Sequence, residues 1–338
     1  MRRLSLMRVA VLTVLVAALI GRGHAQEAYP TRTVRIVVPA APGSTTDTLA
    51  RIMADALARS FAKPVIVENV AGGAMNAGAT AVAHAAPDGY TLMVAPPAPL
   101  AFNDLIYRDL AYRPSAFVPI TLLAKIPNIL AVRNDLPANS LAALIAYGRA
   151  HPGELSYASQ GVGSTAHLSA SQLEALAGIS MVHVPYRGAQ PALTDLMASR
   201  VDLFFDTPTT SAPLYRAGLL KILAVADLER TPALSAIPTF SEAGLPGFRS
   251  ITWFGLVAPP GTPTAIAERI NRDALAALSS TEVSGKLRLL SLDPGATRPN
   301  QVIERKPGRP ASEKVGTSGS AAMRPRSATA RILSIPAR

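Results

Sequence analysis

Short apolar segments alternate with amphipathic segments along most of the chain, and this alternation constrains the fold more than any other feature. The apolar segments are as long as buried strands; they cover residues 34–38, 65–67, 90–94, 129–132, 182–184, 201–205, 222–225 and 253–257. In the intervening segments apolar residues recur at helical spacing, first over 49–57 and then over 141–149, 165–177, 191–199 and 263–278. The alternation predicts an α/β fold of mostly parallel sheets with helices on both faces.

The amino terminus has the order of a secretory signal peptide, which is basic, then apolar, then small. Arg2, Arg3 and Arg8 precede an apolar run over 9–20, and small residues lead up to Ala25. The run is shorter than the roughly 20 residues that a membrane-spanning helix needs, so a membrane anchor or a buried helix is the weaker interpretation. We expect cleavage after about Ala25 and a location in the periplasm.

The chain has no cysteine, so neither a disulfide framework nor a cysteine-linked lipid anchor can support it. About 280 residues between the termini are enough for two domains, each with its own core. The five histidines lack metal-ligand spacing. The glycine-rich stretch 72–78 lacks the Gly-Lys-Ser/Thr ending of a phosphate-binding loop, so we interpret it as a turn into a helix. We therefore expect neither a metal nor a cofactor.

The formal net charge of +11 is carried mainly by the two ends of the chain. Residues 1–25 contain four arginines and no acid, and residues 304–338 contain eight Lys or Arg against two Glu, which leaves about +1 for residues 26–303. A basic protein invites a nucleic-acid hypothesis, but this distribution argues against one. The basic tail has no aromatic residue and little apolar periodicity, so we expect it to be disordered.

Four loops at strand ends carry the candidate binding residues, because ligands of open α/β sheets bind beyond the carboxyl ends of the strands. The first loop follows strand 34–38 and opens a helix; its residues are Gly43, Ser44, Thr45, Thr46 and Asp47. A helix start presents unpaired N–H groups and the positive end of the helix dipole, which suits an anion. The same residue types are also preferred helix caps, and both interpretations remain open.

The second loop repeats this pattern with Gln160, Ser164, Thr165 and His167 around a Gly-x-Gly sequence. Two such helix starts, facing each other across a cleft, could hold one anion between them. Ser164 and His167 also permit a nucleophile and its base. Their spacing differs from the Gly-x-Ser-x-Gly elbow of hydrolases, so catalysis is the weaker hypothesis.

The third loop contains Tyr186, Arg187 and Gly188, and the fourth contains Asp206 and Thr207. Arg187 could clamp a carboxylate through two parallel hydrogen bonds, or it could simply face solvent. Asp206 could accept hydrogen bonds from a ligand amine or a bound water, or it could cap the helix that follows.

At these loops the chain resembles the Bug-type receptors of the tripartite tricarboxylate transporter family. The matching blocks run in the family order from about residue 29 to about residue 300, and several long blocks in register argue against chance similarity. They lie at residues 29–30, 34–38, 42–47, 64–69, 86–92, 155–159, 183–188, 242–247 and 253–259.

The resemblance implies a type II periplasmic binding protein fold, in which two α/β lobes enclose a ligand cleft and are joined by two crossover strands. Lobe 1 would comprise residues 26–125 and 251–303, and lobe 2 would comprise residues 126–250. The implied function is that of a solute receptor rather than an enzyme, which passes a small carboxylate to the membrane permease subunits of the transporter. Family ligands are di- and tricarboxylates, acidic amino acids and aromatic acids, and we expect a monomer.

Two other functions remain open beside this one. One is a ligand sensor that docks on a membrane signalling protein instead of a transporter. The other, which the loop spacing favours less, is a periplasmic serine hydrolase.

Three departures from the family pattern lie at the expected cleft. Ser44 stands where the family usually has a second glycine, and Thr207 stands where it often has asparagine. An Ala-Pro-Pro-Ala sequence from Ala95 to Ala98 replaces a more polar loop, so both of these alanines join the candidate ligand contacts. The resemblance therefore does not identify the carboxylate.

A fourth departure concerns the end of the chain. Family receptors usually continue with an acidic amphipathic helix after residues 294–295, whereas this chain becomes basic. We interpret residues 304–338 as a disordered tail or as the product of a reading-frame change.

Overall fold

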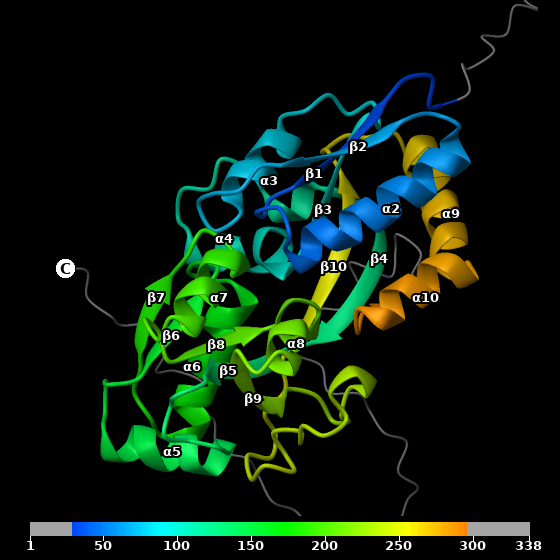
Figure 1. The fold of residues 1–338 in the computed structure, drawn as a ribbon. Coiled ribbons are helices and arrows are strands. Elements are labelled where there is room, and N and C mark those ends of the chain that lie inside the picture. Colours follow the sequence, from blue (N-terminus) through cyan, green and yellow to red (C-terminus); the bar gives the residue numbers. More distant parts are fainter. Residues whose placement is uncertain (1–28, 296–338) are drawn as a thin grey trace, which may run out of the picture. The chain divides into compact units, whose positions relative to one another are not determined.

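A computed structural model of the chain describes residues 29–295, which form two β-sheets covered by helices (Figure 1). Lobe 1 is built on the six-stranded sheet and lobe 2 on the five-stranded sheet. The expected leader (residues 1–25) and tail (residues 304–338) lie outside the described residues, so both stay predictions. The boundaries given above for the two lobes also stay a prediction.

The sheet of lobe 1 has the strand order β11-β4-β10-β3-β1-β2. Its strands are β1 Val34–Val38, β2 Val65–Asn69, β3 Thr91–Ala95, β4 Val118–Pro127, β10 Ile251–Ala258 and β11 Asp293–Pro294. Neighbouring residues of a strand point to opposite faces, and β1 shows this clearly. Ile36 packs toward helices α2, α9 and α10, whereas Val37 packs toward α3. These helices are α2 Thr45–Phe61, α3 Asn76–Ala83, α9 Thr264–Ser279 and α10 Thr281–Leu289.

The sheet of lobe 2 has the strand order β7-β6-β8-β5-β9 and encloses a core of its own. Its strands are β5 Ile129–Arg133, β6 Ser156–Ser159, β7 Val182–Pro185, β8 Leu203–Asp206 and β9 Leu220–Val225. Its helices are α5 Leu141–Ala150, α6 Thr165–Ala177, α7 Ala189–Met197 and α8 Pro208–Arg216. Four shorter helical segments complete the described elements: η1 Ala98–Phe102, α4 Asn103–Ile106, η2 Pro114–Ala116 and η3 Pro232–Leu234.

Both sheets are mixed, which corrects the expectation of mostly parallel sheets. Strand β1 runs parallel to β2 and β3, and β6 runs parallel to β7 and β8. Strand β10 is antiparallel to β3 and β4, and β5 is antiparallel to β8 and β9. The antiparallel strands are those at which the chain passes directly from one sheet to the other. Strand β4 leaves lobe 1 at the junction where β10 enters it, and β5 begins at the edge of its sheet where β8 and β9 end, so these neighbouring strands run in opposite directions.

Two adjacent crossings join the lobes. Strand β4 continues through the single residue Asn128 into β5, and the chain returns through Ser250 into β10. The main-chain N–H of Asn128 donates to the carbonyl of Ser250 (2.9 Å), and its side-chain amide donates to Ser250 Oγ (2.7 Å). The predicted two-lobed α/β fold with two crossover strands is confirmed.

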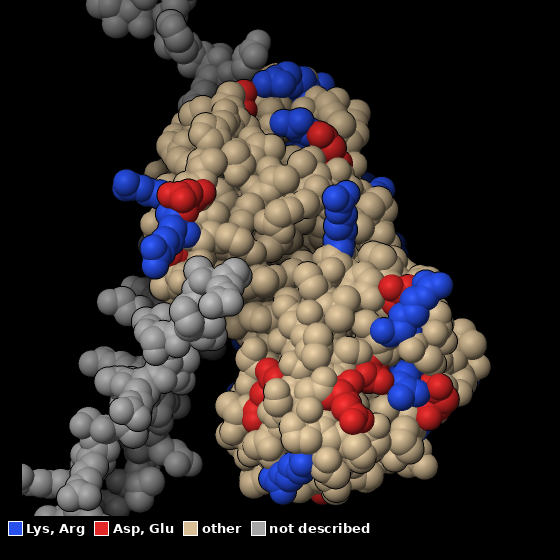
Figure 2. Space-filling model, turned by 90° about the vertical axis from the view of Figure 1, so that its left-hand side faces the viewer, with Lys and Arg blue, Asp and Glu red and all other residues tan. Residues whose placement is uncertain are grey.

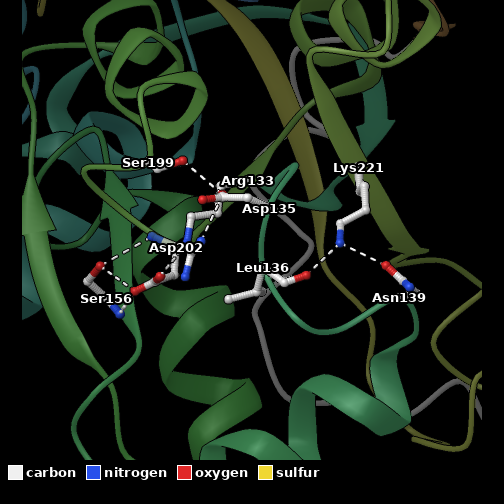
Figure 3. Close-up of polar contacts among 8 residues, drawn as sticks. All are labelled: Arg133, Asp135, Leu136, Asn139, Ser156, Ser199, Asp202 and Lys221. Carbon is white, nitrogen blue, oxygen red and sulfur yellow. Dashed lines mark hydrogen bonds and ion pairs between the residues drawn. The ribbon is translucent and has the colours of Figure 1, made fainter.

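A polar network fastens the end of β5 that lies away from the crossings (Figure 3). Arg133 pairs with Asp202 (2.8 Å) and Asp135 (2.7 Å), and Asp202 accepts hydrogen bonds from the N–H and the hydroxyl of Ser156. From β9, Lys221 donates to a carbonyl of the turn after β5, and burial lowers the pKa of this lysine. The network ties β5 to the first residue of β6 and to the residue before β8, so its role is to hold the sheet together.

Charged side chains are scattered over the face shown in Figure 2, with both signs interspersed and wide uncharged areas between them. Ion pairs such as Arg32–Asp88 and Arg230–Glu242 are exposed, so each contributes little stability. This face presents no continuous basic surface for a nucleic acid. Within residues 29–295, no helix is long and apolar enough to cross a bilayer.

Candidate ligand-binding site

A cavity of about 400 Å³ is lined by residues of both lobes. It brings together twelve of the sixteen candidate residues, although contact with a ligand stays a prediction for each. The twelve are Ser44, Thr45, Thr46, Ala98, Gln160, Ser164, Thr165, Tyr186, Arg187, Gly188, Asp206 and Thr207. The four that do not line the cavity are Gly43, Asp47, Ala95 and His167.

The start of α2 combines a helix cap with unused hydrogen-bond donors. Ser44 is the N-cap, and its hydroxyl accepts the N–H of Asp47 (3.2 Å). The N–H groups of Thr45 and Thr46 have no acceptor among residues 29–295. Thr46 is only 4% exposed, yet its hydroxyl makes no hydrogen bond within the described chain. Capping and anion binding are thus compatible here, because different residues serve the two purposes.

Asp47 holds this loop from behind and does not face the cavity. Its carboxylate accepts hydrogen bonds from the N–H of Gly43 (3.0 Å), from Arg51 (3.1 Å) and from Asn69 (3.0 Å). Burial opposes ionisation of Asp47, but these hydrogen bonds outweigh it and lower the pKa of the carboxyl. The turn itself needs glycine at position 43, where φ is +75°.

The start of α6 has the same organisation. Ser164 is the N-cap and accepts the main-chain N–H of His167 (3.3 Å), while the N–H groups of Thr165 and Ala166 have no acceptor in the described part of the chain. The His167 ring lies behind the loop, where its Nδ1 faces the N–H of Gly163 (3.4 Å). Burial lowers the pKa of His167. The Ser164 hydroxyl therefore serves the helix and is not hydrogen-bonded to the imidazole, as a nucleophile and base would be.

A second histidine supports the loop before α6. Ser159 Oγ lies 2.6 Å from His183 Nε2 and accepts the N–H of Gly161 (3.0 Å). The ring of His183 stacks on Tyr157, and its centroid lies 4.5 Å from that of His167. Burial and the neighbouring His167 lower the pKa of His183 to about 4, so it is neutral near pH 7.

The two remaining loops add one guanidinium group and one buried carboxyl group to the cavity wall. Arg187 is exposed and makes no ion pair with any described residue. Asp206 is 3% exposed and accepts hydrogen bonds from the hydroxyls of Thr210 and Ser211, so it braces the first turn of α8. Burial raises the pKa of Asp206. Thr207 Oγ1 lies 2.7 Å from Thr45 Oγ1, which links the loops of the two lobes directly.

Several cavity residues were not anticipated from the sequence. The loop 71–75 follows the carboxyl end of β2, so the positional rule that identified the other loops applies to it equally. Asn128 and Thr252 line the cavity at the two crossings, and Thr252 Oγ1 donates to Asn128 Oδ1 (3.0 Å). Tyr107 reaches the cavity after α4 and has no local sequence signal. Phe205 and Phe254 belong to the buried hydrophobic core and also form part of the cavity wall.

The cavity therefore offers hydrogen-bond donors at two helix starts, an exposed guanidinium and an apolar wall. Four N–H groups and two threonine hydroxyls, those of Thr46 and Thr165, are unpaired within residues 29–295. Such donors suit a small anion. Over the same residues, no group of three His, Asp or Glu side chains is placed to hold a metal ion.

Comparison with known sequences identifies a family. The profile described as "Tripartite tricarboxylate transporter family receptor" matches residues 49–305. The UPF0065 protein of the tcbD-tcbE intergenic region of a Pseudomonas species is 36% identical over 284 residues, which is 84% of each chain. The protein BugT of Bordetella pertussis is 34% identical over 277 residues, covering 81% of this chain and 85% of BugT.

Comparison with solved structures finds proteins of the same kind. Rpa4515 of R. palustris, solved with adipate, is 40% identical with a TM-score of 0.79. MatC of Rhodopseudomonas palustris, solved with malate, is 37% identical with a TM-score of 0.75, and the periplasmic binding protein BugD is 32% identical with a TM-score of 0.75. Each alignment covers 81% of this chain and 92% of the other. These likenesses confirm the predicted periplasmic binding protein fold.

Proposed function

The chain belongs to the receptor family of the tripartite tricarboxylate transporters, and we propose that its solute is a small carboxylate held where α2 and α6 begin. One observation carries the proposal: two helix starts, one from each lobe, present four unpaired N–H groups and two free hydroxyls to a single cavity. Each helix start carries a partial positive charge, and N–H donors to a carboxylate make strong, charge-assisted hydrogen bonds.

The exposed Arg187 strengthens the preference for an anion, since it is the one cationic side chain among the described residues of the cavity wall. Rpa4515 and MatC were solved with adipate and malate, which are both small carboxylates. In this chain Pro96, Ala98 and the rings of Phe205 and Phe254 give the wall an apolar part. The proposed solute therefore combines a carboxylate with a short carbon skeleton.

The proposed setting is the periplasm, after removal of the leader near Ala25. There the protein acts as a monomer that binds its solute between the lobes and passes it to the permease subunits in the membrane. Hydrolysis at Ser164 is not favoured, because its hydroxyl caps α6 and does not contact the His167 ring. If Ser164→Ala abolished an esterase activity of the purified protein, the receptor function would be wrong.

A thermal-shift panel tests the proposed function. The panel contains adipate, malate, citrate, glutamate and benzoate, with glucose and spermidine as a neutral and a cationic control. A carboxylate present at about 100 times its Kd should raise the free energy of unfolding by roughly 2.7 kcal/mol. Stabilisation by glucose or spermidine, with none by the carboxylates, would contradict an anion site.

A further inference from the structure

The short segment after β3 brings lobe 1 into contact with the loop that precedes α6 in lobe 2. Elements η1 and α4 occupy residues 98–106, and Tyr107 follows them. Tyr107 lines the cavity, as do Gln160, Gly161 and Val162 of the opposite loop. The segment therefore forms one wall of the cavity and lies against the loop whose helix start presents N–H donors.

A hydrogen bond joins these two parts. The hydroxyl of Tyr107 donates to the carbonyl of Val162 over 3.0 Å, two residues before the N-cap Ser164. Burial raises the pKa of Tyr107, so the hydroxyl keeps its proton and remains a donor near neutral pH. Because Tyr107 belongs to lobe 1 and Val162 to lobe 2, the bond exists only while the lobes lie together.

The backbone of the same loop packs closely on α4. Gly163 has a φ of +83°, and a Cβ at this position would lie 2.6 Å from Ile106 Cδ1 and 3.3 Å from Asn103 Oδ1. A side chain at Gly163 would require the end of the Ile106 side chain to move, and the positive φ would strain the backbone of any residue other than glycine.

Asn103 completes the contact in an unusual way. Its Nδ2 donates to the carbonyl of Ala74 and to Asn76 Oδ1, both within lobe 1. Its Oδ1, which lies beside Gly163, is buried and has no hydrogen-bond partner among residues 29–295. A buried acceptor without a donor destabilises the state that buries it. Asn103 Oδ1 therefore has no donor at the place where α4 faces Gly163, and Tyr107 supplies the hydrogen bond between these two parts.

We propose that Tyr107 is a positioning residue for the solute: it holds the loop 160–164, and with it the start of α6, against the bound carboxylate and so slows release. The inference rests on the proposed function, since it requires a carboxylate at the start of α6. Solute enters while the lobes are apart and the bond is absent, so association does not depend on it. Release requires the bond to break, so dissociation does.

The test is Tyr107→Phe, which removes the hydroxyl and keeps the ring in the wall. The full chain is mixed, in a stopped-flow instrument, with whichever acid of the carboxylate panel gives the largest thermal shift. The single tryptophan, Trp253, lies three residues after the crossing residue Ser250, so its fluorescence is followed as a report of lobe movement. Loss of one neutral hydrogen bond should speed dissociation by roughly three- to tenfold, and association should change less than about twofold.

Tyr112→Phe is the matched control. The Tyr112 hydroxyl donates to Asn76 Oδ1 (2.8 Å) entirely within lobe 1, so this variant should leave both rate constants unchanged. A second comparison is Thr209→Val, which removes another bond between the lobes, from Thr209 Oγ1 to the carbonyl of Leu290 (2.7 Å). This variant leaves the loop 160–164 intact, so its effect on dissociation should be smaller.

An unchanged dissociation rate constant in Tyr107→Phe would overturn the inference. An equal increase of that rate constant in Thr209→Val would also overturn it, because any bond between the lobes would then slow release equally. Neither result would contradict the proposed function as a carboxylate receptor. Failure of every acid in the panel to bind would instead overturn the proposed function, and the inference with it.

Discussion

Each hydroxyl at the cavity is either used by the fold or free for a solute, and the structure separates the two groups. Ser44 and Ser164 cap helices, and Thr207 contacts Thr45 across the lobes. Thr46 and Thr165 make no hydrogen bond within residues 29–295. Side chains of one chemical type, a few residues apart, thus carry different roles.

Thr46→Val should weaken carboxylate binding without weakening the fold. The substitution keeps the shape of the side chain and removes a hydroxyl that makes no hydrogen bond within the described protein, so the loss in binding free energy should be about 1 kcal/mol. Isothermal titration would measure the affinity, and urea unfolding without solute would measure stability. Thr48→Val, on the same helix but outside the cavity, is the control and should leave affinity unchanged.

At the scale of elements, α2 and α6 begin in the same way, with a serine N-cap followed by residues that face the cavity. The side chain of each serine accepts an N–H of the first helical turn, and glycine is also an acceptable N-cap residue although it lacks this acceptor.

Two substitutions at Ser44 should separate the cap from the backbone. Ser44→Ala should lower the free energy of unfolding by about 1 kcal/mol, whereas Ser44→Gly should lower it by only a few tenths, roughly 0.3 kcal/mol. Urea denaturation of the two variants beside the unsubstituted protein would measure the difference. Equal losses for alanine and glycine would contradict the capping role.

The neighbouring strands β6 and β7 carry a pH-dependent element. His183 has a pKa of about 4, below its usual 6.5, because burial and His167 disfavour the charged form. Between these two pH values the unfolded chain binds a proton that the folded chain does not. Protonation of His183 therefore does not lower the free energy of unfolding above about pH 6.5, and lowers it progressively as the pH falls toward 4.

His183→Gln should reduce that dependence. Between about pH 7 and about pH 4.5, the free energy of unfolding of the unsubstituted protein should fall by about 1–2 kcal/mol more than that of the variant. Solvent screens the partly exposed ring and keeps this difference small. Urea unfolding at both pH values would measure the difference. His84→Gln, an exposed histidine in the turn after α3, is the control and should behave like the unsubstituted protein.

At the scale of the whole molecule, the two lobes are joined where the crossings meet, and Asn128 is central to that junction. Its amide donates to Ser250 Oγ (2.7 Å), and its Oδ1 accepts the hydroxyl of Thr252 (3.0 Å). Ser250 Oγ also lies 2.6 Å from Ser169 Oγ, and Ser169 belongs to α6. The junction is thereby linked to the helix whose start presents donors to the cavity.

Asn128→Ala should destabilise the protein by about 2–3 kcal/mol, because it leaves the buried hydroxyl of Thr252 without its partner and removes the link between the crossings. Urea unfolding would measure the loss. Asn134→Ala, which removes an exposed hydrogen bond to the carbonyl of Gly218, is the matched control and should cost less than about 1 kcal/mol. Similar losses in both variants would show that Asn128 has no special place in the junction.

Local patterns were enough to predict most strands, the helix starts and the family. The helix over 165–177 has the predicted bounds because its cap and apolar spacing lie within a few residues of one another. Strand β4 was not predicted, since Pro119, Thr121 and Lys125 interrupt its apolar run, and its pairing with β10 and β11 makes it a strand.

The membership of the cavity was decided by tertiary structure. Tyr107, Asn128 and Thr252 meet the two helix starts there because the order of the strands and the two crossings bring distant segments together. Asp47 and His167 share the same sequence motifs as their neighbours but face away from the cavity. A motif specifies hydrogen bonds along a few residues of backbone, whereas the direction in which a side chain points into a cavity depends on what the other lobe places opposite it.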